Sequence, residues 1–211
     1  MKIAAVLVTF LLTVIAWSAP ATAEPAIVGH VDGVRGGVQL IRMGSVLAIS
    51  ADTLIQEGDQ LQTEAGGRVR IRFRDNTRIV LAETTQFQVK RYRFNPEKEH
   101  SDARFKLISG AFRAVTGAIG QQENPTFEVE TPVATMGIRG TDFWGGFIFN
   151  GDLDVAMFSG KGVYVRNTLG QVELIRQGEG VTVKEGLAPA DPKLWPEWKL
   201  QEAIDATRLS P

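Results

Sequence analysis

Short runs of alternating apolar and polar residues recur along most of the chain, with turn-forming residues between them. The clearest run extends from Arg68 to Arg74, where apolar side chains alternate with four arginines. A period of two is the repeat of a β-strand, so one face of this strand should be apolar and the other should carry the arginines. Asp75-Asn76 separates it from a second β-rich run at 77–82, a spacing that predicts a tight hairpin.

Further runs follow at intervals typical of all-β proteins. They cover 38–43, 53–55, 86–94, 103–108, 111–115, 126–130, 143–149, 153–158, 163–166, 172–175 and 181–183. Asn150-Gly151 adds a strong hairpin signal after the run at 143–149. The pattern predicts an all-β fold, a roll or solenoid-like sandwich of many short, mostly antiparallel strands.

The first residues have a different pattern. Lys2 precedes a largely apolar run of 15 residues, 3–17, and Ala21-Thr22-Ala23 follows. This is the pattern of a secretory signal peptide, so residues 1–23 are expected to be removed by a cut after Ala23. The alternative is an uncleaved anchor, but a run of 15 residues is short for a membrane span, which needs about 20. The mature chain is therefore expected to be periplasmic or secreted, without a membrane span.

The last residues also leave the strand pattern. A linker with two prolines, 188–192, is followed by Pro196 and a helical stretch with a suitable first turn. The sequence thus predicts a β domain over 24–186 and a linker with a short C-terminal α-helix over 187–211. We expect this helix to dock on the β domain, with a partner-binding helix as the alternative.

The composition of the chain limits the kinds of catalytic and metal sites that it can contain. The chain has no Cys and only two His, His30 and His100, which lie far apart. Thiol catalysis, Cys-based zinc sites and iron–sulfur clusters are excluded, and no nucleotide-binding loop or nucleophile elbow is present. Asp152/Asp154 and Glu128/Glu130 could each share a strand face and hold a cation or act on a glycan, but a solvated acidic face is the commoner arrangement. No catalytic residue, metal or cofactor is predicted, so a non-enzymatic role is expected.

Charge is concentrated in the middle of the chain, where residues 68–113 hold 12 basic and 5 acidic residues. The candidate partner-binding residues are the arginines of the alternating strand and the next one: Arg68, Arg70, Arg72, Arg74 and Arg78. Lys90, Arg91 and Arg93 are expected to extend this surface. An envelope protein or an anionic glycan is the expected partner, and export disfavours nucleic acid. The alternative is a solvated face paired with acids such as Glu83 and Glu128.

The segment TPVATMGIRGTDFWGG, residues 131–146, is predicted to be a strand junction. Thr131-Pro132 favours an extended entry, and Gly137 and Gly140 bracket Arg139. We expect Arg139 to be buried and paired with Asp59, Asp75 or Asp142, so that Arg139→Ala costs about 3–5 kcal/mol. A ligand-binding arginine is the alternative.

Several of these strings resemble a known family. Gly58-Asp59-x-Leu61-x-Thr63, Asp75-Asn76-Thr77, Thr131-Pro132-x-Ala134 and Arg139-Gly140-Thr141-x-Phe143 are similar to the motifs of the FecR domain, over roughly residues 27–185. The resemblance implies a periplasmic β domain with these structural motif residues: Asp59, Thr63, Asp75, Thr131, Pro132, Arg139, Gly140 and Thr141. It offers no catalytic residues.

The founding members of that family are iron-uptake regulators with a cytoplasmic anti-sigma segment and a membrane helix. A predicted signal peptide stands in their place here, so a standalone exported domain is expected and sigma-factor control is not implied. The expected function is a non-enzymatic protein-binding or scaffolding module of the bacterial envelope. The alternative is a soluble periplasmic component that relays the envelope or iron-uptake state to a membrane regulator.

Overall fold

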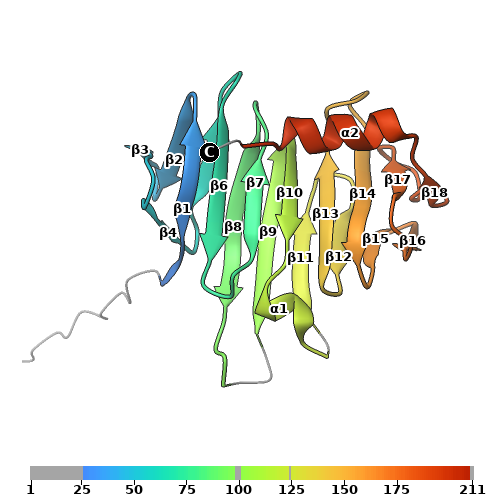
Figure 1. Ribbon diagram of the computed structural model, residues 1–211, viewed down its shortest axis with the longest axis horizontal. Coiled ribbons are helices and arrows are strands. Elements are labelled where there is room, and N and C mark those ends of the chain that lie inside the picture. The colour runs from blue at the N-terminus through green and yellow to red at the C-terminus, as the bar shows by residue number, and fades with distance from the viewer. Residues whose placement is uncertain (1–25, 98–100, 124, 210–211) are drawn as a thin grey trace, which may run out of the picture.

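Two nine-stranded sheets pack face to face in the computed structural model, which describes residues 26–97, 101–123 and 125–209 (Figure 1). Sheet A contains β4 (Leu54–Gln56), β1 (Ile27–Arg35), β6 (Arg68–Phe73), β7 (Arg78–Leu81), β10 (Ala111–Val115), β13 (Thr141–Gly146), β14 (Leu153–Gly160), β17 (Glu179–Val183) and β18 (Lys193–Leu194), in that spatial order. The all-β prediction is confirmed. The predicted signal peptide lies outside the described residues.

Sheet B contains β3 (Ser45–Ala48), β2 (Val38–Arg42), β5 (Gln60–Thr63), β8 (Gln86–Arg93), β9 (Asp102–Ser109), β11 (Thr126–Glu130), β12 (Thr135–Ile138), β15 (Val163–Asn167) and β16 (Gly170–Leu174), again in spatial order. In both sheets the order along the sheet nearly follows the order along the chain. The chain therefore crosses repeatedly between the sheets while advancing from one end of the sandwich to the other, as a roll or solenoid-like sandwich requires. Within the described residues, β9 and β11 form the one parallel pair.

The core lies between the sheets and follows from the alternation in the sequence. In β6, Val69, Ile71 and Phe73 are buried in the core, and the intervening arginines are on the outer face. β6 and β7 pair as the predicted hairpin, and Asn76 at its turn has a φ of 66°, which asparagine tolerates. A chain of aromatic contacts runs through the core along the sandwich, made by Phe73, Phe87, Phe105, Phe112, Phe127 and Phe143.

The predicted C-terminal helix is α2 (Glu197–Ala206), and it crosses the ends of several strands of sheet A (Figure 1). It packs on the outer face, where Ala82, Ala111 and Ala156 present small side chains beside Trp144. Small residues allow the helix to approach the sheet closely, so Trp195 and Ala203 become buried there. A second short helix, α1 (Ala118–Gln121), connects the two sheets between β10 and β11.

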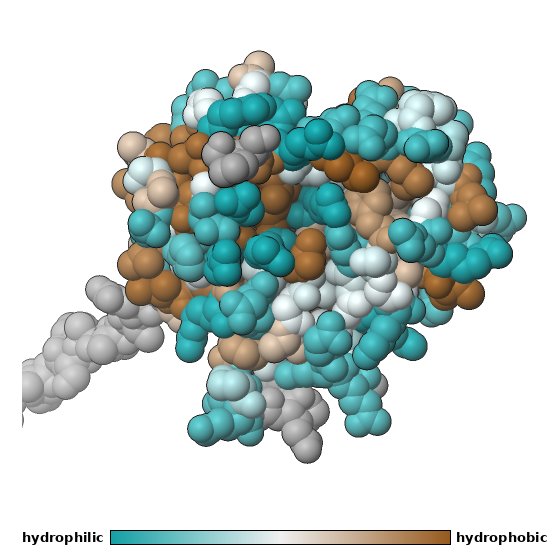
Figure 2. Space-filling model, viewed as in Figure 1, coloured by the Kyte–Doolittle hydropathy of each residue, from teal (hydrophilic) through white to brown (hydrophobic). Residues whose placement is uncertain are grey.

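Both ends of the sandwich expose apolar residues, which include Leu169, Ile175 and Leu194 at the end formed by β16 and β18. Exposed apolar residues gather over β1 to β4, at the left flank of the view in Figure 2, and include Ile27, Met43, Val46, Leu47 and Leu54. We call these five residues the apolar end. Monomeric proteins rarely expose contiguous apolar patches without a use for them. No helix of the described ranges is long and apolar enough to cross a membrane.

Candidate functional site

The family-motif residues lie at or next to strand ends, some where the chain passes from one sheet to the other and some between neighbouring strands of one sheet. Asp59, between β4 and β5, is 1% exposed and accepts two hydrogen bonds from Arg42, at 2.8 Å from Nε and 2.7 Å from Nη2. The backbone N–H of Gln56 donates to the same carboxylate. The hydrogen bonds to Asp59 outweigh desolvation and raise the pKa of Arg42, so the guanidinium stays charged. This pair stabilises the connection where the chain passes from β4 in sheet A to β5 in sheet B.

Thr63 and Asp75 also make buried hydrogen bonds between the two sheets. The hydroxyl of Thr63, in β5, donates to the carbonyl of Ala82 at 2.6 Å and accepts from the N–H of Thr85 at 2.8 Å. Asp75, at the β6–β7 turn, is 2% exposed and accepts from the hydroxyl of Tyr92 at 2.8 Å. Burial, together with this carboxylate, raises the pKa of Tyr92. The Asp75 carboxylate also accepts from Thr77 and from the N–H of Ile119 in α1.

The segment 131–146 is a junction between sheets, with β12 in sheet B and β13 in sheet A. At its start, the Thr131 hydroxyl bonds both backbone groups of Ala134, beyond the exposed Pro132. At the crossing, Gly140 has a φ of 56° and the Thr141 hydroxyl donates to the carbonyl of Gly162 at 2.8 Å. The predicted junction is therefore present, and threonine hydroxyls hold it.

Arg139 differs from the prediction. Its side chain is exposed, and within the described residues it forms no ion pair. The three expected partners are occupied: Asp59 by Arg42, Asp75 by Tyr92 and its neighbours, and Asp142 by Arg113, at 2.7 and 2.8 Å. The prediction of a buried Arg139 is wrong, because the chain turns at Gly140 and directs the residue before it outward. The backbone N–H of Arg139 still donates to the carbonyl of Gly162, which continues the pairing of β12 with β15 in sheet B.

The arginine strand and the C-terminal helix, predicted as separate features, contact each other. Arg68 Nε donates to the carbonyl of Ala206 at 2.8 Å, and Arg70 Nη1 donates to that of Leu209 at 3.4 Å. The last carbonyls of a helix lack partners within the helix and carry partial negative charge. These two arginines therefore anchor the end of the chain. We refer to residues 187–209 as the C-terminal strap.

Within the strap, the first turn of α2 is held by a buried ion pair. Lys199 Nζ lies 2.9 Å from Asp154 Oδ1, and the Asp154 side chain is fully buried. Thr182 donates to the same oxygen, and the ammonium lies over the rings of Trp195 and Phe149, at 4.0 and 4.6 Å from the centroids. A cation in such a site is stabilised by the carboxylate and by the ring faces. The one signal for this site in the sequence is a lysine four residues after Trp195, and the prediction missed it.

The remaining arginines of the strand stay available at the surface. Asp32 in β1 accepts from both Arg70 and Arg72, at 3.0 and 3.1 Å. Burial alone would raise the pKa of Asp32, but hydrogen bonds and charge from these arginines lower it below its ordinary value. One carboxylate is thus shared between two guanidinium groups. Arg74 and Arg78 are exposed, and neither forms an ion pair within the described residues. We call Arg72, Arg74 and Arg78 the arginine surface.

The arginine surface adjoins the apolar end. On the outer face of sheet A, Arg78 lies directly opposite Arg72, Arg72 opposite His30, and His30 opposite Leu54. Like charges directly opposite each other in a sheet are destabilising. Leu54 is 49% exposed at the end of this row. The row therefore combines uncompensated positive charge with apolar surface.

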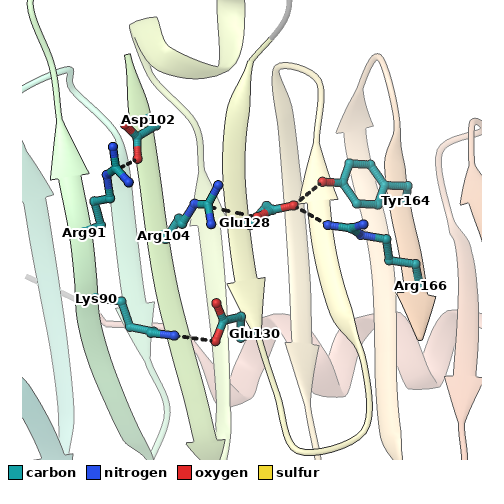
Figure 3. A network of polar contacts seen from close by, with 8 residues as sticks. All are labelled: Lys90, Arg91, Asp102, Arg104, Glu128, Glu130, Tyr164 and Arg166. Atoms are coloured by element: carbon teal, nitrogen blue, oxygen red, sulfur yellow. Dashed lines mark hydrogen bonds and ion pairs between the residues drawn. The ribbon is translucent and has the colours of Figure 1, made fainter. Parts of the chain in front are cut away.

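Two further predictions about charge are corrected. Lys90, Arg91 and Arg93 do not extend the arginine surface, because β8 belongs to sheet B. Lys90 and Arg91 contribute instead to a network on the opposite outer face, where Lys90 pairs with Glu130 and Arg91 with Asp102 (Figure 3). Glu128 belongs to that network as well, and Glu83 caps the N–H of Gly66. Neither acid neutralises the arginine strand.

The paired acids do not form a cation site. Asp154 is paired with Lys199, whereas the Asp152 carboxylate accepts from the side-chain amide of Asn150 in the preceding turn. Glu128 accepts from Arg166 at 2.8 Å and from the hydroxyl of Tyr164 at 2.9 Å. Burial and this carboxylate raise the pKa of Tyr164 to about 12. Across the described ranges, no group of three or more His, Asp or Glu side chains could hold a metal ion.

An open cleft of about 710 Å³ lies between the strap and the turns at the ends of sheet A. Its apolar wall includes Phe147, Ile148 and Ala206, and its acidic groups are Glu83, Glu202 and Asp205. Arg68 also lines it, but this arginine is bound to the end of α2. The cleft contains no pair of groups arranged as nucleophile and base.

The fold is a two-sheet β sandwich in which most of the motif residues hold turns and crossings by hydrogen bonds. Residues 59–161, just under half of the chain, match the family described as FecR protein. The resemblance inferred from the sequence motifs is thereby confirmed, and this segment includes all of the motif residues. No match was found among curated protein sequences.

Solved structures with the same fold were also found. Two are crystal structures described as "a putative anti-sigma factor from Parabacteroides distasonis ATCC 8503", at 1.65 and 2.50 Å resolution. Each is 16% identical to this chain with a TM-score of 0.53, and the match covers 67% of this chain and 62% of the solved one. At this identity the similarity establishes a shared fold, and the chain spans less than two thirds of those proteins.

Proposed function

We propose that this protein is an exported, non-enzymatic binding module of the bacterial envelope, which acts in regulation or scaffolding by binding another protein. The FecR match and the similarity to structures described as anti-sigma factors support a regulatory class. Apart from the exposed Arg139 side chain, the polar groups of the family motif form structural hydrogen bonds. The function is therefore assigned to the surface rather than to the motif.

One observation supports the arginine surface as the contact site for the partner. Arg78 and Arg72 face each other across two strands with a single shared carboxylate nearby, and the row continues to the exposed Leu54. A partner that offers acidic groups beside an apolar patch would relieve the repulsion and cover the apolar end. Arg68 and Arg70, which hold the strap, are excluded from this contact surface.

The contribution of the arginine surface can be tested by affinity capture from envelope extracts. The variant Arg74→Glu/Arg78→Glu changes two exposed residues whose side chains make no hydrogen bond or ion pair within the described residues. Lys184→Glu is the matched control, because Lys184 is exposed after β17 at the far end of sheet A. We expect the double variant to lose its captured protein by about tenfold or more and the control to retain it. Equal capture by both would refute this surface.

An anionic glycan is the second candidate for the same arginines, since a carboxylate or sulfate group between Arg72 and Arg78 would also relieve their repulsion. Binding of polygalacturonate to the purified protein, abolished by the double variant, would favour the glycan. Capture of one protein from extracts treated to remove polysaccharide would favour the protein. A relay of envelope state to a membrane regulator is compatible with the protein partner alone.

A further inference from the structure

The outer face of sheet B carries a row of glutamines at its N-terminal half. Gln39 in β2 lies directly opposite Gln62 in β5, and Gln62 lies opposite Gln86 in β8. In the next row Gln60 lies opposite Gln88. All five are half-buried. The three strands therefore present an array of carboxamides in register.

This array differs from the rest of the same face. At the other half, acidic and basic side chains satisfy one another, as Glu128 does with Arg166 and Glu130 with Lys90 (Figure 3). Among the described residues, the five glutamine side chains make one hydrogen bond, from Gln39 Nε2 to Glu64 Oε1 at 3.3 Å. Most of their donors and acceptors are thus available to another molecule. An in-register glutamine array also favours self-association through amide ladders, so it is a costly way to make a surface polar.

The first row borders a hollow of about 260 Å³, the amide hollow, lined by Gln39, Gln62, Thr63, Glu64, Thr84 and Gln86. The backbone positions the single carboxylate there. A Cβ at Gly37 would overlap the Glu64 side chain, so the missing side chain of this glycine gives the carboxylate its place beside Gln39. Gly37 has no positive φ, which means that its role is spatial rather than conformational.

The lining excludes several classes of ligand. It has no Lys or Arg, so it offers nothing to an anion, and no apolar side chain, so it offers little to an apolar ligand. One carboxylate is too few for a protein metal site. What remains is a neutral ligand whose groups both donate and accept hydrogen bonds, as carboxamides and the Thr84 hydroxyl do.

We propose that the amide hollow binds a neutral oligosaccharide, whose hydroxyl groups pair with the amides of Gln39, Gln62 and Gln86 and with the Glu64 carboxylate. Adjacent strands lie about 4.8 Å apart, so the row of three amides extends over about 10 Å. This length suits a short oligosaccharide that lies across the strands. The site is on the opposite sheet from the arginine surface, so it does not depend on the proposed function.

The test is NMR titration of the purified ¹⁵N-labelled protein, in which glutamine side-chain NH₂ groups give their own signals. Maltotriose and N-acetylated chitotriose are the neutral probes, and trigalacturonate is the anionic one, each at about 10 mM, where a millimolar Kd gives high occupancy. We expect a neutral probe to shift the NH₂ signals of Gln39, Gln62 and Gln86, with trigalacturonate leaving them unchanged. If neither neutral probe shifts these signals, or if trigalacturonate shifts them more strongly, the proposal is wrong.

Two variants make the test specific. Gln62→Leu removes the central amide from a half-buried position without a large change in size, and we expect binding to weaken by about tenfold. Gly37→Ala displaces Glu64 without removing any polar group of the hollow, and it should weaken binding as well. Gln171→Leu, in β16 at the other end of the sheet, is the control and should bind as the unaltered protein does. Equal binding by Gln62→Leu and the control would also overturn the proposal.

Discussion

Lys199 donates a 2.9 Å hydrogen bond to Asp154, and this contact joins the first turn of α2 to a fully buried carboxylate of sheet A. Asp154 has no other cationic partner in the described residues. The buried carboxylate therefore depends on Lys199 for its ion pair. At the other end of α2, Arg68 contacts the last carbonyls. The strap is held electrostatically at both ends.

We expect Lys199→Met to destabilise the protein by about 3–5 kcal/mol, because the variant leaves a buried charge without its partner. Urea denaturation followed by tryptophan fluorescence would measure the change, since Trp144 and Trp195 are buried beneath the strap. The double variant Lys199→Met/Asp154→Leu should recover much of the loss, because apolar residues can replace a buried pair at little cost. A single variant as stable as the unaltered protein would show that the pair does not hold the strap.

At the junction between β12 and β13, we expect Thr141→Val to cost about 1–3 kcal/mol and Arg139→Ala less than about 0.5 kcal/mol. The Thr141 hydroxyl is buried and bonds the carbonyl of Gly162, whereas the Arg139 side chain is exposed. Thermal unfolding of the two variants would compare them directly. The reverse order would reinstate a structural role for the Arg139 guanidinium.

Acid should remove the contribution of the Glu179 carboxylate to the stability of the fold. Burial would raise the pKa of this carboxyl, but the backbone N–H groups of Arg176 and Ile175 and the Arg176 guanidinium lower it below its ordinary value of 4.5. Its stabilising contribution is thus complete above about pH 4.5 and is lost as the pH falls from there through the lowered pKa.

Measurement of the unfolding free energy from pH 7 to pH 3 would test whether this contribution is lost as the pH falls. The stability difference between the unaltered protein and Glu179→Gln should be largest near neutral pH and shrink below pH 4.5, the ordinary pKa. Glu185→Gln, at an exposed position, serves as the control. A difference that stays constant across the range would mean that the Glu179 carboxyl is not held in its charged form.

The sequence predicts the strands well because their signal is local. Alternation in β6 identified both the buried face and the arginine face, and Asp75-Asn76 identified the hairpin. The sequence pattern does not show which strands share a sheet, because strand pairing depends on contacts between residues that are far apart in the chain. For this reason Lys90 was assigned to the face of Arg72, although β8 and β6 lie in different sheets.

The same limitation applies to the side-chain partners. The motif Arg139-Gly140-Thr141 identified the correct junction, but the turn at Gly140 exposes the arginine and buries the threonine. Asp32 and Arg70 are 38 residues apart, and Asp154 and Lys199 are 45 apart. No pattern within one strand or helix reveals such pairs. The contact between the arginine strand and the strap, separated by more than 130 residues, follows only from the fold.

The most direct test of the proposed function is photo-crosslinking in intact cells of the native host. A photoreactive phenylalanine analogue at Leu54 would lie beside the arginine surface, and the same analogue at Leu169 would lie at the opposite end of the sandwich. Both positions are exposed and apolar, so they differ mainly in location. We predict that position 54 crosslinks to one envelope protein, that position 169 does not, and that Arg74→Glu/Arg78→Glu abolishes the product. Equal products from both positions, or a product at position 54 that persists in the double variant, would contradict the account.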